Sequence, residues 1–512
     1  MVTTPPQSEV SAERLPPSTR LIIGTLLIAA FVVILNETIM GVALPRLMAE
    51  LSVSARTGQW LTTAFMLTLA VVIPTTGFLL QRMSTRTVFV LAMTLFSAGT
   101  LLAAVSPGFW MLLPARIVQA SGTAVMIPLL MTTVLRLVPI ERRGIVMGNI
   151  SIAISVAPAI GPTVSGLILQ FLSWRFMFVL VLPIALAALA YGARTLTDVS
   201  ETGHQKLDPV SVVLSVPAFG GIVYGLSQLG QGSAAGSSIA IGSLVVGVVG
   251  LLAFGVRQRG LARAERDPLL DLRPFGFRMF SVSLALLCVA MLSLFGMVIL
   301  LPIYLQTIRG LGSLPTGLML LPGGLLMGLL GPTVGKLFDR YGPKALATGG
   351  AAVLTFTMWR FSMVDTGTPI WMLIGLHVLM SLALACLFTP SFTTALNPLP
   401  PYLYSHGSAI LATLQQVAGA AGTAMLVAIM AARTATLTAA GQPELTALNE
   451  GLNTAFAVAA VVSIGAIVLA LFMRQTKPEL PGPPPSVDDL DAGEDRPTDG
   501  APGPQPQREV HL

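Results

Sequence analysis

Long runs of apolar residues recur along the chain from about residue 21 to about residue 473, with only short polar segments between them. Most runs hold about 20 residues, the length of helix that crosses a hydrocarbon core about 30 Å thick. In that core the backbone must satisfy its own hydrogen bonds, which a helix does within one segment. The pattern therefore predicts an all-α, polytopic membrane protein with 14 spans. We expect the spans at residues 21–45, 60–81, 87–106, 109–134, 145–169, 175–194, 209–229, 236–256, 279–301, 314–335, 343–361, 369–391, 408–431 and 453–473.

Composition supports this class. Hydrophobic residues make up 54% of the 512 residues, charged residues make up 10%, and the mean hydropathy is +0.80. The 49 glycines and 37 prolines fit as well, because membrane helices tolerate both residues. Cys288 and Cys386 both fall inside predicted spans, so we expect neither a disulfide nor a metal site.

The basic residues are spread among short loops, and they predict a topology. Their dispersal argues against a nucleic-acid surface, despite a pI near 9.7. Of the 29 lysines and arginines, 22 fall on one side of the predicted spans and six on the other, while Arg116 lies within a span. The positive-inside rule then places both termini in the cytoplasm. We expect a multi-pass membrane protein.

The sequence offers little chemistry of the kind that enzymes or pumps need. It contains no phosphate-binding loop motif and no long soluble segment, which argues against a nucleotide-driven pump. A membrane-embedded enzyme would need clustered ionisable residues or metal ligands in the spans, and the chain has only four histidines. We therefore expect no enzyme activity and no cofactor. Any energy source would be an ion gradient.

Glu37 is the only carboxylate inside a long apolar run, flanked by Asn36 and Thr38 in the first predicted span. A buried acid without a countercharge is costly in a bilayer, so it either keeps its proton or finds a partner. Glu37 is thus a candidate functional residue, and it suggests that the protein handles protons.

Two related loops follow the second and the tenth predicted spans. The first is GFLLQRMSTR and the second is GKLFDRYGPK. Glycines there allow close helix packing, and an acid–arginine pair can lock a short cytoplasmic loop. Two such loops indicate an internal duplication, which is typical of transporters whose halves move about a central site. A generic basic turn is the alternative for the first loop taken alone. The candidate gating residues are Gly77, Arg82, Arg86, Gly335, Asp339, Arg340 and Gly342.

These loops resemble those of the major facilitator superfamily, whose motif runs G-x-L-x-D-R-x-G-R-K. The second copy matches well. The first copy has Gln81 where the family has an acid and Ser84 where it has glycine. A lock made by a charged pair is therefore not expected in the N-terminal half.

Three further motifs narrow the resemblance. LLPARIVQASG in the fourth span is similar to the family's L-x-x-x-R-x-x-Q-G motif and retains Arg116 and Gln119. APAIGPTVSG in the fifth span resembles the antiporter motif G-x-x-x-G-P-x-x-G-G and retains Gly161, Pro162 and Gly166. Small residues there would let this helix pack closely on a neighbour.

LNETIMGVALP in the first span resembles the L-D-x-T-I-V-N-V-A-L-P motif of fourteen-span drug:proton antiporters. Asn36 replaces the family's acid, and Glu37 supplies a carboxylate one residue later, about 100° round the helix. The amino-acid sequences of the first, second and fourth spans most resemble those of lincomycin-resistance-type multidrug exporters. The resemblance covers roughly residues 20–475.

The resemblance implies a major facilitator fold of two six-helix bundles plus two inserted transmembrane helices. The glycine-rich inserted pair has no ionisable residue in its interior, so a scaffold role is favoured over a transport role, and Asp208 beside it is expected to be solvated. The predicted organisation is a cytoplasmic leader 1–20, an N-terminal bundle 21–194, the inserted pair with its flanking loops 195–278, a C-terminal bundle 279–475 and a disordered cytoplasmic tail 476–512.

Glu37 and Arg116 are predicted at similar depth in the membrane, because each lies about seven or eight residues from the outer end of its span. Our hypothesis is that they face one N-terminal cavity and couple proton binding to transport. A static structural pair that joins two helices is the alternative. The candidate substrate-cavity residues are Asn36, Thr38, Gln119, Gln415 and Gln416.

The resemblance thus implies a proton-coupled exporter of lipophilic or cationic small molecules, antibiotics among them, that works by alternating access in the bacterial inner (cytoplasmic) membrane. Its partners would be the small-molecule substrate, protons and the lipid bilayer, with no nucleic acid, and we expect a monomer. A specific exporter of a single metabolite, such as an amino acid or a siderophore, would share every motif and stays open as an alternative.

Overall fold

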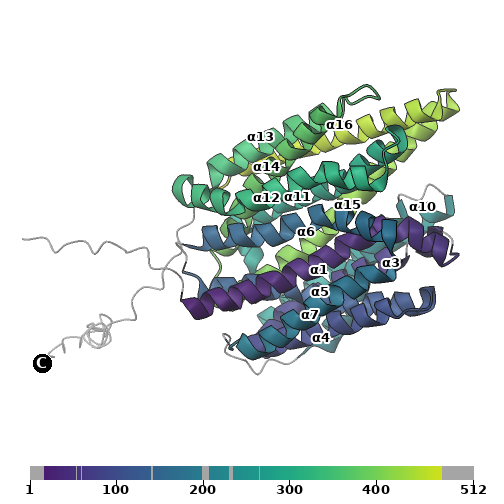
Figure 1. Ribbon diagram of the computed structural model, residues 1–512. Coiled ribbons are helices and arrows are strands. Elements are labelled where there is room, and N and C mark those ends of the chain that lie inside the picture. The colour runs from purple at the N-terminus through teal and green to yellow at the C-terminus, as the bar shows by residue number, and fades with distance from the viewer. Residues whose placement is uncertain are drawn as a thin grey trace, which may run out of the picture. The chain divides into compact units, whose positions relative to one another are not determined.

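The computed structural model describes residues 16–53, 55–58, 60–139, 142–198, 207–229, 234–264 and 266–474. Every regular element in these ranges is a helix (Figure 1). The first half holds α1 (Pro17–Glu50), α2 (Ala55–Gly58), α3 (Trp60–Arg82), α4 (Thr85–Ala104), α5 (Phe109–Leu137), α6 (Arg143–Phe171) and α7 (Arg175–Thr195). The middle holds α8 (Pro209–Ser215), η2 (Val216–Gly220), α9 (Gly221–Leu229) and α10 (Ala234–Arg263). The second half holds η3 (Arg273–Gly276), α11 (Arg278–Ile303), η4 (Tyr304–Ile308), α12 (Ser313–Tyr341), α13 (Pro343–Phe361), α14 (Ile370–Leu396), η5 (Pro401–Leu403), α15 (Tyr404–Ala439) and α16 (Glu444–Leu471).

The apolar runs of the sequence form these helices. Within the described ranges, twelve helices are long and apolar enough to cross a membrane, which confirms an all-helical, multi-pass class. Helices α6 and α13 cover the two other predicted ranges, but they are not among the twelve. A total of fourteen spans therefore stays a prediction.

The predicted span 209–229 is a rod of three consecutive elements. Helices α8 and α9 are joined by the π-helical turn η2, which contains Pro217. Proline has no N–H to donate within the helix, so the wider π turn accommodates it without ending the rod. A second π turn, η4, follows Pro302 at the end of α11.

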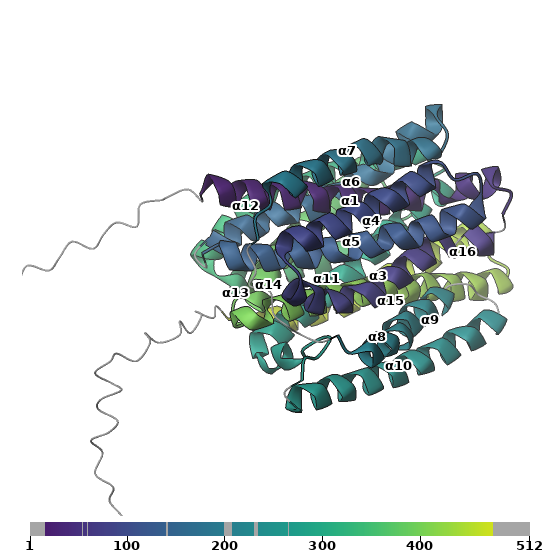
Figure 2. The same ribbon diagram turned by 90° about the horizontal axis from the view of Figure 1, so that it is seen from below.

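The long helices pack in two sets. Helices α1 and α3 to α7 contact one another in the first set, and α11 to α16 contact one another in the second. The two sets meet where α6 packs along α12 and where α3 and α5 pack against α15. Helices α9 and α10 pack on each other, and α9 also contacts α3 and α15 (Figure 2).

Two predicted segments lie mostly outside the described residues. Helix α1 begins at Pro17, so of the predicted leader only residues 16–20 are described. The predicted tail 476–512 falls outside the described residues altogether. Its disorder therefore stays a prediction.

Candidate functional site

Glu37 lies where helices from both sets meet. Its side chain on α1 is partly exposed, and its carboxyl group accepts a hydrogen bond from the Gln416 side chain on α15. It also interacts electrostatically with Arg116 on α5. That interaction acts over a distance, because the direct ion pairs in the described part of the chain do not include it. The acid is thus placed between a cation of its own set and an amide of the other set.

Arg116 is held by neutral partners. The side chain is 1% exposed, its Nη1 donates to Gln119 Oε1, and its guanidinium lies over the Phe65 ring with 4.0 Å to the ring centroid. Gln119 is fixed in turn, because its Nε2 donates to Thr100 Oγ1 at 2.7 Å. A buried charge is costly unless it is paired, and an amide oxygen and an aromatic face offset part of that cost. The network fixes the direction of the guanidinium, and none of the ion pairs among the described residues includes Arg116.

Two buried donors, one in the first-span motif and one in the fourth-span motif, lack hydrogen-bond partners among the described residues. They are Nδ2 of Asn36, whose residue is 3% exposed, and Nε of Arg116. Unsatisfied buried donors are rare in folded proteins and need a reason. Such donors can bind a small molecule that carries hydrogen-bond acceptors.

The antiporter-motif helix α6 packs closely on α1. The Thr38 hydroxyl donates to Leu35 O at 2.9 Å in its own helix and to Ala157 O at 3.4 Å in α6. Gly161 lies against the same hydroxyl, and a Cβ at this glycine would collide with it. Glycine at 161 therefore permits the contact that places the neighbouring Glu37. The side chain of Pro162 lies outside the described residues, and Gly166 is partly exposed on α6.

The adjacent glutamines of α15 have different environments. Gln415 is 7% exposed, and its Nε2 donates to Leu411 O of the same helix at 3.0 Å. Gln416 is partly exposed and reaches Glu37. Of the two glutamines predicted for the substrate cavity, the structure therefore brings only Gln416 to the acid.

At the arginine-rich end of the molecule, where Arg82 and Arg86 are exposed, the first loop motif contacts the other set. A Cβ at Gly77 on α3 would lie 2.7 Å from Nδ1 of His406 on α15. Nearby, Gln81 Nε2 donates to Tyr402 O at 3.0 Å. These neutral contacts join α3 to the start of α15, without the acid that the family has at position 81.

The second loop motif makes the corresponding contact between α12 and α6. Gly335 and Asp339 both lie against Gly144, in the first turn of α6. A carboxylate there faces the positive end of a helix dipole, which is favourable. Among the described residues no ion pair joins Asp339 to its neighbour Arg340, because adjacent side chains on a helix point in different directions. Arg340 lies over the Tyr341 ring instead, at 5.3 Å, and Gly342, with φ of 76°, connects α12 to α13.

Known proteins identify the family. Residues 26–423 match the Major Facilitator Superfamily. The chain belongs to this superfamily. Its members are transporters rather than enzymes, which confirms the prediction of a non-enzyme and makes this chain a membrane-embedded transporter of small molecules.

Several superfamily members are similar over most of their length. The chain is 41% identical over 460 residues to the lincomycin resistance protein LmrB of Bacillus subtilis, covering 88% of this chain and 95% of that protein. It is 39% identical over 461 residues to LmrB of Listeria monocytogenes, with coverage of 89% and 97%. It is 28% identical over 407 residues to the multidrug resistance protein B homolog of Mycobacterium tuberculosis, with coverage of 79% and 74%.

A solved structure shares the fold. The crystal structure of the human organic anion transporter MFSD10 (TETRAN) matches 89% of this chain and all of its own, with a TM-score of 0.63 and 15% sequence identity. This likeness supports the major facilitator fold and nothing finer.

One buried arginine at the arginine-rich end of this superfamily member was not predicted from the sequence. Arg143 is 4% exposed at the start of α6, and it donates to Leu135 O at 2.5 Å and to Val138 O at 3.1 Å. It also donates to Asn397 Oδ1 and to the Tyr404 hydroxyl, both at 3.3 Å, so it connects the two helix sets.

The internal duplication was the pattern that could have identified this position. Arg143 precedes Gly144 at the start of α6, and His406 precedes Gly407 at the start of α15. Each pair therefore occupies a corresponding place in one half, and each contacts a loop motif or a helix of the other half. No pattern in the sequence indicates Thr100, whose role depends on the packing of α4 against α5.

Proposed function

We propose that this transporter is a proton-coupled exporter, a drug:proton antiporter of lipophilic or cationic small molecules that include antibiotics. The observation that carries the proposal is the position of Glu37. It is partly exposed between the two helix sets, beside Arg116 and hydrogen-bonded to Gln416. An ionisable residue inside a membrane helix is a functional-site hypothesis by default, and here its partners come from both halves.

Glu37 acts as the proton carrier in this account. With its proton lost, the carboxylate attracts Arg116 and accepts from Gln416, which draws α1, α5 and α15 together. With its proton bound, the attraction to Arg116 is lost. A cationic substrate competes with the proton for the same carboxylate, so binding of one favours release of the other. Arg116 is the countercharge in this exchange, and Gln119 with Phe65 keeps it in place.

The two helix sets serve as the bundles that tilt about this site, with fourteen spans in all and α8 to α10 as the inserted pair. The arginine-rich end faces the cytoplasm, as do both termini, and the protein acts in the bacterial inner membrane as a monomer. The positive-inside rule supports this orientation.

The names of the relatives support the substrate class. Two proteins 39% and 41% identical to this chain are lincomycin resistance proteins, and a more distant one is a multidrug resistance protein homolog. The two unpaired donors, Asn36 Nδ2 and Arg116 Nε, fit substrates that carry hydrogen-bond acceptors as well as apolar surface.

Efflux in everted membrane vesicles tests the proposal. Vesicles with the wild-type protein should accumulate ethidium, a lipophilic cation, when respiration builds a proton gradient, and an uncoupler should abolish the accumulation. The Glu37→Gln variant should lose gradient-driven accumulation at equal expression. Glu50→Gln is the matched control, because Glu50 lies at the end of the same helix in an exposed pair with Arg46.

Unchanged accumulation by Glu37→Gln would refute the proton role of this residue. Accumulation that resists the uncoupler would refute proton coupling itself. A panel that adds lincomycin, amino acids and a siderophore separates a broad drug exporter from an exporter of a single metabolite.

A further inference from the structure

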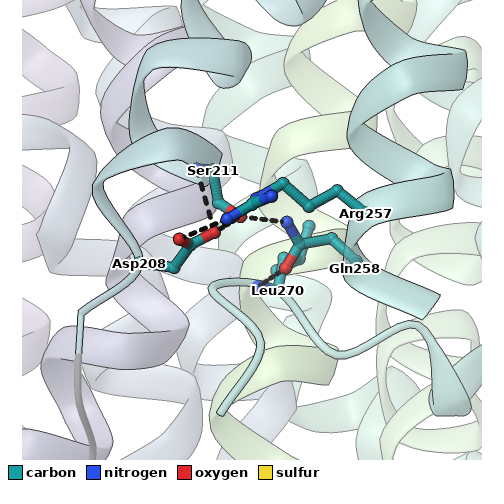
Figure 3. Close-up of polar contacts among 5 residues, drawn as sticks. All are labelled: Asp208, Ser211, Arg257, Gln258 and Leu270. Atoms are coloured by element: carbon teal, nitrogen blue, oxygen red, sulfur yellow. Dashed lines mark hydrogen bonds and ion pairs between the residues drawn. The ribbon is translucent and has the colours of Figure 1, made fainter. Parts of the chain in front are cut away.

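An ion pair connects the start of α8 to α10 at the arginine-rich end of the inserted helix pair. Asp208 caps α8, since its Oδ2 accepts from Ser211 N at 3.1 Å and from Ser211 Oγ at 2.5 Å. Arg257 on α10 donates to both carboxylate oxygens, each at 2.7 Å (Figure 3). The Asp208 side chain is only 15% exposed, so the expectation of a solvated acid was wrong. A bidentate pair of this kind fixes direction as well as distance.

Gln258 extends this network to the next loop. The residue is 1% exposed, and its Nε2 donates to Ser211 Oγ at 2.7 Å. Its Oε1 accepts from the backbone N–H of Leu270 at 3.2 Å (Figure 3). One buried amide therefore joins α8, α10 and the segment that leads from α10 to α11.

The same segment contacts the helix that meets the first loop motif. The backbone N–H of Asp271, the residue after Leu270, donates to Nδ1 of His406 on α15 at 3.3 Å. Arg273 Nε donates to the Asp271 carboxylate at 2.7 Å, and the Arg273 guanidinium lies over the Tyr402 ring at 5.3 Å. His406 packs on Gly77, and the Tyr402 carbonyl accepts from Gln81, as described above. A continuous series of contacts thus runs from the inserted pair to the contact between α3 and α15.

The inserted pair is also a close-packed unit that contacts α3 elsewhere. A Cβ at Gly221 on α9 would lie 2.8 Å from the Gly247 Cα on α10, so the two backbones approach closely. At the first residue of α3, Trp60 stacks on Tyr224 of α9, with ring centroids 5.6 Å apart. Helix α3 is therefore supported by the pair both at its start and near its end.

We propose that the inserted helix pair is a latch that holds α15 against α3 at the arginine-rich end, with Gln258 as its positioning residue. Gln81 stands at the α3–α15 contact where the family has an acid, and none of the ion pairs among the described residues joins α3 to α15. The latch supplies the missing support by fixing Leu270 and Asp271, which in turn hold His406. The inference rests on the proposed alternating access, in which this contact must open and close. A weaker latch shifts the population toward the state in which α15 has separated from α3.

Distance measurements between spin labels test the latch without any transport assay. The labels replace two exposed residues at the arginine-rich end, Arg86→Cys beside α3 and Pro401→Cys before α15, in the full chain with Cys288→Ser and Cys386→Ser. In reconstituted wild-type protein the short distance should dominate. Gln258→Met, which keeps the volume and removes both hydrogen bonds, should raise the long-distance population at least threefold.

Two further variants make the outcome decisive. Gln228→Met, on α9 of the same pair and outside the network, is the matched control and should leave the distribution unchanged. Ser211→Ala removes the partner of Gln258 Nε2 and the hydroxyl bond to Asp208, but it keeps the bond between Gln258 and Leu270. It should therefore give a smaller shift in the same direction, and it serves as the test if Gln258→Met does not fold. Distributions identical to wild type in a folded Gln258→Met or Ser211→Ala protein would overturn the latch.

The failure of the latch and the failure of the proposed function are distinguishable. The distance distribution depends on no substrate and no proton gradient, so it can contradict the latch while ethidium efflux stays normal. Conversely, absent efflux with an intact response to Gln258→Met would refute the exporter and leave the latch standing.

Discussion

The carboxyl group of Glu37 on α1 accepts a hydrogen bond from the side chain of Gln416 on α15, so the acid of the first span contacts the opposite half of the protein. A proton that arrives at or leaves this carboxyl group changes an interaction between halves. It also changes the interaction with Arg116 within one half. In the proposed mechanism both effects change the relative position of the helices, which alternating access requires.

The two neighbouring glutamines of α15 provide a matched test of this contact. Gln416→Leu removes the hydrogen bond to Glu37, and we expect gradient-driven ethidium transport to fall by about tenfold, which corresponds to the loss of one hydrogen bond to a charged group. Gln415→Leu removes only a bond within α15 and should retain most of the transport rate. Equal losses in the two variants would show that the contact with Glu37 is not the reason for the defect.

Arg116 should not tolerate lysine. A lysine keeps the charge, but it cannot reproduce the planar guanidinium that binds Gln119 and stacks on Phe65. We expect Arg116→Lys to lower initial transport rates by about tenfold or more, for the loss of one such charged contact. Arg433→Lys, at an exposed position near the end of α15, is the control and should transport normally. Wild-type rates in Arg116→Lys would mean that charge alone is needed at this position.

The contact between Thr38 and Gly161 predicts a compensating pair of substitutions. Gly161→Ala introduces a methyl group where the Thr38 hydroxyl lies, and we expect it to destabilise the protein by about 1–3 kcal/mol, as overpacking does. Thr38→Ala in the same chain should restore much of the loss. Gly24→Ala is the control, because a Cβ there meets open space.

Thermal unfolding in detergent measures the stability of the wild type, Gly161→Ala, the double variant and Gly24→Ala. A Gly161→Ala protein as stable as wild type, or a double variant no better than the single one, would contradict the close α1–α6 packing that positions Glu37.

The ion pair between Asp208 and Arg257 should make the stability of the protein depend on pH. The Arg257 guanidinium holds the pKa of this carboxyl group well below its usual range, with further help from Ser211. A depressed pKa in the folded state contributes stability that is complete above the unfolded pKa of about 3.9 and is lost as the pH falls through the folded value. The Tm difference between wild type and Asp208→Asn should therefore be constant from about pH 8 to pH 5 and should shrink only below about pH 4.

Glu450→Gln is the comparison for this experiment. Glu450 pairs with Arg433, both side chains are exposed, and Arg433 Nη2 lies 3.8 Å from Glu450 Oε2. Removal of this pair should therefore leave Tm unchanged at every pH. A Tm difference for Asp208→Asn that varies between pH 5 and pH 8 would show that another group controls the stability of the inserted pair.

The helices of this protein were largely predictable from the sequence, because a continuous apolar run of span length has few alternatives to a membrane helix. Each predicted range lies within one helix or runs past its end by no more than about two residues, except that 209–229 covers α8, η2 and α9, and the predicted superfamily is confirmed. The π turn at Val216–Gly220 was not predicted, since a proline within an apolar run can also be accommodated by a simple kink. The number of spans and the orientation of the chain stay predictions.

The candidate site was predictable only in part. Glu37 and Arg116 could be found because a charge in an apolar run is rare, and their similar depth followed from the helix rise. The choice of Gln416 over Gln415 depends on the rotation of α15 against α1, which no local pattern encodes. The hydrogen bonds of Gln119 and His406 were not predicted for the same reason, because each depends on a partner that is distant in the sequence or on another helix. The substrate-cavity role of Gln119 stays a prediction.

Proton release on substrate binding tests the central claim most directly. Purified wild-type protein in weakly buffered detergent solution, at a pH where Glu37 carries its proton, should release protons into a pH-sensitive dye when ethidium is added. Glu37→Gln should bind ethidium more weakly and should release no protons even at saturating ethidium, while Glu50→Gln should behave as wild type. Equal proton release by wild type and Glu37→Gln would contradict the account, because the exchanged proton would then come from another group.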